Sequence, residues 1–168
     1  MIRSRQTLAL YMRNFIFGVE DSLVSTVGFI SGIAIAGVAV ADIVLTGFVL
    51  ISVEAFSMGV GSFLSEYSAE EFEQKKVVSN KGAATGAVIM FLSYLLSGFI
   101  PLLPYVLIPE SLYVMGVSVA LTLFALALLA VFNGKMSRVP VWNEVFRMIV
   151  ISGLSIVVGT VVGSFIHF

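Results

Sequence analysis

Five apolar segments, each long enough to cross a lipid bilayer, dominate this sequence. A membrane-spanning helix needs about 20 mainly apolar residues, and the segments lie at about 15–39, 43–64, 82–103, 112–132 and 145–167. The composition agrees, because 59% of the 168 residues are hydrophobic and only 11% are charged, whereas a soluble domain has about 25% charged residues. The sequence therefore predicts an all-α membrane protein, with one domain of five transmembrane helices over residues 1–168.

The basic residues predict how these helices are oriented. All nine lysines and arginines lie before the first segment or near the polar connections 65–81 and 133–143. Five spans put these regions on one side of the membrane, and the opposite connections carry only Asp42 and Glu110. Because basic loops stay in the cytosol, we expect a cytosolic N-terminus and a C-terminus outside. Without a recognisable targeting extension, a prokaryotic plasma membrane is the expected location.

Several function classes are disfavoured by composition. The chain has no cysteine and one histidine, which rules out disulfides, iron–sulfur clusters and thiolate metal sites. The net charge of −1 gives no reason to expect nucleic acid as a partner. There is no nucleophile–base pair and no glycine-rich phosphate loop, so we expect neither an enzyme nor a bound cofactor.

Three acidic side chains fall inside the apolar segments, namely Glu20, Asp21 and Glu54. A charge at the bilayer centre costs roughly 2.5–3.5 kcal/mol on insertion scales, and such residues usually face a bundle interior or a water-filled path. Glu54 is followed one helical turn later by Met58. We therefore treat these acids as candidate functional residues, with Glu20 the exception that could simply face the lipid headgroups.

Two helical stripes connect the acids with other polar or small residues. Residues four apart share one face of a helix, which groups Glu54, Met58, Ser62 and Glu66 on the second segment, and Asp21, Ser25, Gly28 and Gly32 on the first. If the turn lies near residues 40–41, Asp21 is level with residue 60, within one turn of Met58. The two stripes are then predicted to line one path. Beyond Glu66, the cytosolic Glu70 is either solvated or part of a metal-collecting patch.

Glycines four apart also suggest close helix packing, as in Gly28 with Gly32 and Gly159 with Gly163. Such pairs let helix backbones approach within a membrane. They indicate either packing inside one bundle or contact between two copies.

The chemistry of the candidate residues suits a first-row divalent cation. Carboxylate oxygens bind hard or borderline ions, and a thioether favours iron over magnesium or calcium. Carboxylates lose protons when they bind metal, so metal and proton movement are linked. The candidate metal-binding residues are Asp21, Met58, Glu54, Glu66, Glu20 and Glu70.

Two segments of the sequence resemble the vacuolar iron transporter family. Residues 17–37, FGVEDSLVSTVGFISGIAIAG, are similar to the family's first-helix pattern, and residues 54–65, EAFSMGVGSFLS, to its second-helix pattern. The resemblance implies a homodimer in the lipid bilayer that exports Fe²⁺, and also Mn²⁺, from the cytosol in exchange for protons. It assigns metal-path roles to Asp21 and Met58.

Two departures from that pattern keep other functions open. Ser62 stands where the family often has glutamate, and the connection at 65–81 is too short for the cytosolic metal-binding domain of plant-type members. One alternative is a metal-binding, sensing or scaffold protein without transport. Another is a proton-coupled carrier of a different solute, in which the acids only relay protons.

Overall fold

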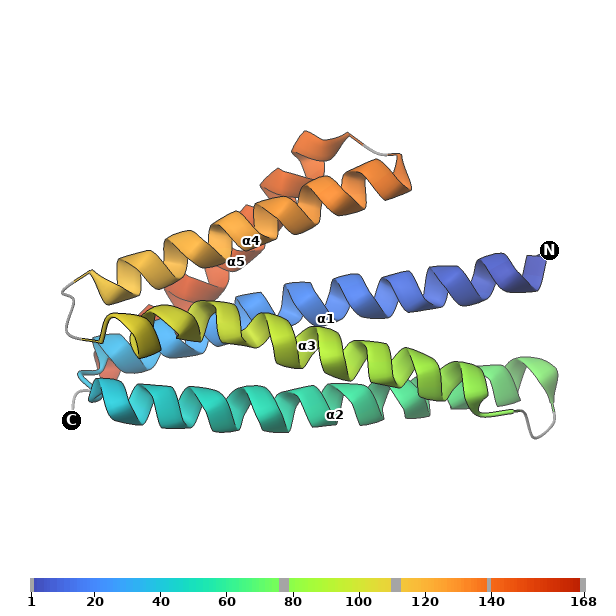
Figure 1. Cartoon of the computed structure of the whole chain (residues 1–168), viewed down its shortest axis with the longest axis horizontal. Coiled ribbons are helices and arrows are strands. Elements are labelled where there is room, and N and C mark those ends of the chain that lie inside the picture. The colour runs from blue at the N-terminus through green and yellow to red at the C-terminus, as the bar shows by residue number, and fades with distance from the viewer. Residues whose placement is uncertain (1, 76–78, 110–112, 139, 167–168) are drawn as a thin grey trace.

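The computed structural model describes residues 2–75, 79–109, 113–138 and 140–166, and within these ranges all regular structure is helical. All five helices are long and apolar enough to cross a membrane, which confirms the predicted all-α membrane fold. The helices, shown in Figure 1, are α1 (Ile2–Ile35), α2 (Val40–Gln74), α3 (Lys81–Leu107), α4 (Val114–Ser137) and α5 (Val141–Phe165).

The helices run up and down, so that alternate connections lie at the same end of the bundle (Figure 1). The α1–α2 and α3–α4 connections lie at one end, with the C-terminus. The N-terminus and the α2–α3 and α4–α5 connections lie toward the other, which we call the basic end because it carries Arg13, Lys75, Lys81, Lys135 and Arg138. The assignment of this end to the cytosol remains a prediction.

The helices extend beyond the expected apolar spans. α1 begins at Ile2, and α2 continues through Gln74 into the stretch that was expected to be a connection, because a helix needs no apolar surroundings to satisfy its own backbone. α2 ends where Lys75 adopts a left-handed conformation, with φ of 53°. The expected span limits at residues 112 and 167 lie outside the described residues, as do Lys76 and Glu110.

The α1–α2 turn comes earlier than expected. α1 ends at Ile35, and Gly37 has a φ of 83°, a conformation that glycine adopts without the penalty that a Cβ brings. The turn therefore spans residues 36–39 rather than 40–41. This shift changes which residues of the two helices lie opposite each other.

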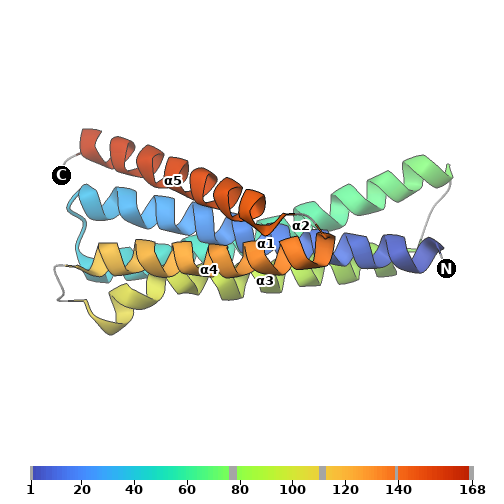
Figure 2. The ribbon, with the colours of Figure 1, turned by 90° about the horizontal axis from the view of Figure 1, so that it is seen from above.

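Helix α1 is the centre of the bundle. Among the described residues it packs against all four other helices, whereas α2 contacts only α1 and α3, and α5 only α1 and α4. Figure 2 shows α1 between the outer helices. One core cluster joins α1 to α4 and α5 around Leu23, Leu126 and Met148, and another joins α1 to α2 and α3 around Ile30 and Ile51.

Glycines bring α1 and α5 into backbone contact. A Cβ on Gly159 would lie 2.0 Å from the Gly28 carbonyl oxygen, and one on Gly163 would lie 2.0 Å from the Gly32 carbonyl oxygen. These glycines therefore pack within one bundle. They also correct the expected first-helix stripe, because Gly28 and Gly32 are covered by α5 and do not continue the polar path beyond Ser25.

We expect Gly159→Ala to destabilise the protein, because the added methyl meets a backbone carbonyl that has no room to move. Overpacking of this kind costs about 1–3 kcal/mol, and each 1 kcal/mol lowers the Tm by about 2–4 °C for a domain of this size. Thermal unfolding in detergent micelles measures the effect. Gly153→Ala is the matched control, since a Cβ there has nothing within 4 Å, and an equal loss in both variants would contradict the assignment.

Candidate functional site

Glu54 is held by hydrogen bonds from two neighbouring helices. The Tyr94 hydroxyl of α3 donates to Oε2 of Glu54, and Ser25 Oγ of α1 donates to the same oxygen at 3.3 Å. Ser25 Oγ and the Tyr94 hydroxyl also lie 2.7 Å apart. Since an unpartnered carboxylate among apolar helices is costly, these contacts explain how an acid is accommodated at this depth.

Tyr94 is the site residue that the sequence analysis missed. It is 1% exposed, and its backbone carbonyl accepts a hydrogen bond of 2.7 Å from Ser22 Oγ on α1. The sequence did contain a signal for this site, namely a tyrosine in the middle of the third apolar segment. A buried tyrosine hydroxyl usually needs a polar partner. Its partner could not be identified without the packing of α3 against α1 and α2.

Asp21 lies near Glu54, but its carboxylate has no hydrogen-bond partner among the described residues. The two carboxylates are close enough to interact electrostatically. Among the described residues, Asp21 makes no hydrogen bond or ion pair. Its side chain is half-buried, so its oxygens are available to a cation in a way that Oε2 of Glu54 is not.

The contacts between α1 and α2 place Asp21 within one helical turn of Met58. Ser25 lies opposite Glu54, and Arg13 lies opposite Glu66. In this antiparallel pair these two contacts put Asp21 opposite Met58, whereas the hydrogen bond from Asn14 to Ser62 puts it opposite Ala55. The sequence predicts Asp21 level with residue 60, and the contacts place it opposite residues 55–58, which is nearer the α1–α2 turn.

A cavity of about 620 Å³ opens between α1 and α2 beside Met58. Toward the basic end the two helices diverge, as Figures 1 and 2 show. The cavity contains a second thioether, from Met90 of α3, and Asn14 Nδ2 donates to Ser62 Oγ at 3.0 Å on its wall. We call it the Met58 cavity; its lining comprises Arg13, Asn14, Phe17, Ser57, Met58, Gly61, Ser62, Ser65 and Met90.

A second cavity, of about 540 Å³, lies nearer the basic end and is acidic. We call it the acidic cavity; its lining comprises Thr7, Leu10, Glu66, Ala69, Glu70, Glu73, Gln74 and Gly82. The structure thus brings together the predicted residues Glu66 and Glu70. Glu66 is also paired with Arg13 of α1 across the gap between the helices.

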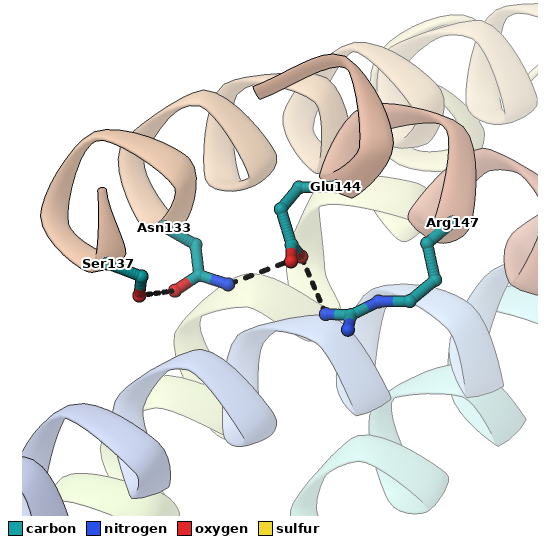
Figure 3. A network of polar contacts seen from close by, with 4 residues as sticks. All are labelled: Asn133, Ser137, Glu144 and Arg147. Atoms are coloured by element: carbon teal, nitrogen blue, oxygen red, sulfur yellow. Dashed lines mark hydrogen bonds and ion pairs between the residues drawn. The ribbon is translucent and has the colours of Figure 1, made fainter. Parts of the chain in front are cut away.

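Glu20 belongs to a different part of the bundle. Arg147 and Glu144 of α5 are among its electrostatic neighbours, and both belong to the polar network drawn in Figure 3. There Arg147 donates to Glu144 at 2.6 Å and Asn133 Nδ2 donates to Glu144 at 3.4 Å, which joins the basic-end parts of α4 and α5. Glu20 therefore faces the α4–α5 side rather than the two cavities.

One protomer does not assemble a closed metal site. Within the described residues, no three acidic or histidine side chains are grouped closely enough to hold an ion. Asp21, Glu54 and Met58 provide ligand atoms at two adjacent levels. Divalent transition metals take four or more ligands, so further ligands must come from water or from another chain.

Tyr94→Phe is expected to lower stability, because it removes the hydroxyl that donates to the Glu54 carboxylate. Hydrogen bonds to charged groups contribute about 1.5–3 kcal/mol, and unfolding in mixed micelles titrated with denaturing detergent measures the loss. Tyr105→Phe is the matched control: Tyr105 is also on α3 and 1% exposed, yet its buried hydroxyl has no partner among the described residues. The interpretation fails if both variants lose the same stability.

The chain is similar in sequence to known membrane proteins. The sequence model of the VIT family matches residues 12–83 and 77–164, two segments that meet at the α2–α3 connection. Vacuolar iron transporter homolog 4 of Arabidopsis thaliana is 27% identical over 152 residues, covering 84% of this chain and 77% of the relative. Vacuolar iron transporter homolog 3 of the same plant is 27% identical over 155 residues, covering 84% and 76%.

A longer relative shows where the chains differ in length. Vacuolar iron transporter 1 of Arabidopsis thaliana is 24% identical over 182 residues, covering 73% of each chain. That alignment is longer than the 168 residues of this chain, so part of the relative has no counterpart here.

Proposed function

This chain belongs to the VIT family, and we propose that it is a homodimeric transporter that moves Fe²⁺, and also Mn²⁺, out of the cytosol in exchange for protons. The observation that carries the proposal is the free carboxylate of Asp21 within one helical turn of the Met58 thioether. A hard oxygen and a soft sulfur at similar depth suit a borderline divalent ion such as Fe²⁺. The names of the relatives, vacuolar iron transporter 1 and vacuolar iron transporter homolog 4, point to the same class of substrate.

The two cavities support a direction of movement. A cation attracted to the acidic cavity at the basic end would find Met58 and Asp21 farther along the same helix pair, and Glu54 one turn beyond Met58. If the basic end faces the cytosol, as the positive-inside rule predicts, this order leads outward. Protonated carboxylates must release their protons to bind the ion, and this linkage supports exchange.

The incomplete site supports the dimer. A single chain offers one free carboxylate and the thioether of Met58 at similar depth, whereas a two-fold pair of chains would offer two of each around one axis. α2 contacts only α1 and α3 among the described residues, so a long face of this helix is not used within the protomer.

We expect Asp21→Asn and Met58→Leu each to slow metal uptake by about tenfold or more, the change that corresponds to about 1.4 kcal/mol of lost metal stabilisation. The measurement uses purified protein in liposomes that contain a metal-sensitive dye and a pH dye, with Fe²⁺ or Mn²⁺ added outside. Metal entering the liposomes should be accompanied by a rise in internal pH. Asp42→Asn and Met136→Leu are matched controls, since Asp42 lies in the first turn of α2, far along the helix from Met58, and Met136 of α4 lines a different cavity.

The same assay separates the alternatives. Metal binding without flux in the wild-type protein would favour the sensing or scaffold function. A proton flux that requires a non-metal solute would favour the proton-coupled carrier of a different solute. Normal metal flux in both variants would show that the path does not use Asp21 and Met58.

A further inference from the structure

The ion pair between Arg13 and Glu66 lies where the two cavities meet. Arg13 lines the Met58 cavity, and Glu66 lines the acidic cavity. Their side chains are joined across the gap between α1 and α2. A cation that moves along the gap between α1 and α2 from the acidic cavity to Met58 would pass this pair.

The charges of the two cavities are opposite in sign. Among the described residues that line the acidic cavity, the charged ones are Glu66, Glu70 and Glu73, all acidic. Among those that line the Met58 cavity, the one charged side chain is Arg13. A cation is thus attracted to the first cavity and then meets a positive charge at the mouth of the second.

The two partners differ in how firmly they are enclosed. The Glu66 side chain is 17% exposed, whereas the Arg13 side chain is 63% exposed. Ion pairs with a solvent-exposed partner are weak, so Arg13 can be displaced while Glu66 stays in place. A divalent ion interacts with the carboxylate about twice as strongly as a guanidinium at equal distance, and a monovalent ion has no such advantage.

The pair is not needed to hold α1 and α2 together at this level. Asn14, next to Arg13 in the chain, already bonds Ser62 of α2 at 3.0 Å. Gly86 of α3 also packs closely against Asn14, since a Cβ there would lie 2.6 Å from Asn14 Nδ2. These contacts join α1 to α2 and to α3 beside the charged pair without using either charge.

We propose that Arg13 is the residue that selects divalent over monovalent cations, by holding Glu66 until a divalent ion takes the carboxylate. This inference rests on the proposed transport of a divalent metal. Displacing Arg13 leaves its guanidinium free to turn toward solvent, and the ion then continues to Met58. K⁺ and Na⁺ do not displace it and stay in the acidic cavity.

The first experiment measures the charge barrier without any transport. The chain has no cysteine, so Ser57→Cys introduces a single thiol in the Met58 cavity, and Ser79→Cys introduces one at the basic end outside both cavities. Each is labelled with cationic and anionic thiosulfonate reagents of similar size. Adding Arg13→Gln should raise the cationic-to-anionic labelling ratio at position 57 by about threefold and leave the ratio at position 79 unchanged.

The second experiment measures transport in liposomes. Arg13→Gln should lower the KM for Mn²⁺ by about threefold with little change in maximal rate, and should make uptake sensitive to competition by K⁺. Glu66→Gln should raise the KM. Arg13→Lys, which keeps the charge, should restore the wild-type KM and the resistance to K⁺. A purely structural role would instead lower the maximal rate of every Arg13 variant.

The outcomes separate this inference from the proposed function. An unchanged labelling ratio at position 57 overturns the role of Arg13, whether or not the protein transports metal. A changed ratio in a protein that carries no metal supports the charge barrier and rejects the transport function. Unaltered K⁺ sensitivity in a transporting Arg13→Gln variant also overturns the inference.

Discussion

The close contact between α1 and α5 positions helix α1, which carries the polar side chains that α2 and α3 bind. Gly28, Gly32 and Gly159 remove the side chains that would keep the two backbones apart, and small residues of this kind drive helix association in membranes. α1 is thereby fixed on its α5 side. Its remaining polar side chains, Asn14 and Ser25 among them, bond to residues of α2 and α3.

Glu54 and Asp21 lie at similar depth but differ in their hydrogen bonding. Both hydrogen bonds to Glu54 end on Oε2, and they come from Ser25 and Tyr94 on two other helices. Asp21 has no such partner among the described residues. Buried charges are stable only when they are paired or hydrogen-bonded. Glu54 therefore joins three helices, while Asp21 gains a partner only when something else comes to the site.

The number of helices and the grouping of charged ends were predictable from the sequence, because length, hydropathy and the positions of lysine and arginine determine both. The approximate match in depth of Asp21 and Met58 was also predictable from helix spacing and a short turn. Its refinement required the contacts between α1 and α2, since the turn signal did not fix the residue at which α1 ends. Helix boundaries are generally the least certain part of a prediction from sequence.

What the sequence did not reveal depends on contacts between helices that are distant in the chain. Tyr94 becomes part of the site only because α3 packs against both α1 and α2. The pairing of Arg13 with Glu66 requires the two helices to be correctly aligned over their whole length. Likewise, the first-helix stripe ends at Ser25 because α5 covers the glycines, and periodicity within one helix carries no information about which neighbour will cover it.

The unbroken length of α2 has a mechanical consequence. Glu54, Met58 and Glu66 belong to one continuous helix, which rises 1.5 Å per residue, so the first and last of them are about 18 Å apart along a single rod. Their spacing along the axis is fixed. If this helix tilts about its middle, the side chain at one end approaches α1 as the side chain at the other end withdraws. One rigid body thus couples the width of the opening at the basic end to the room around Glu54.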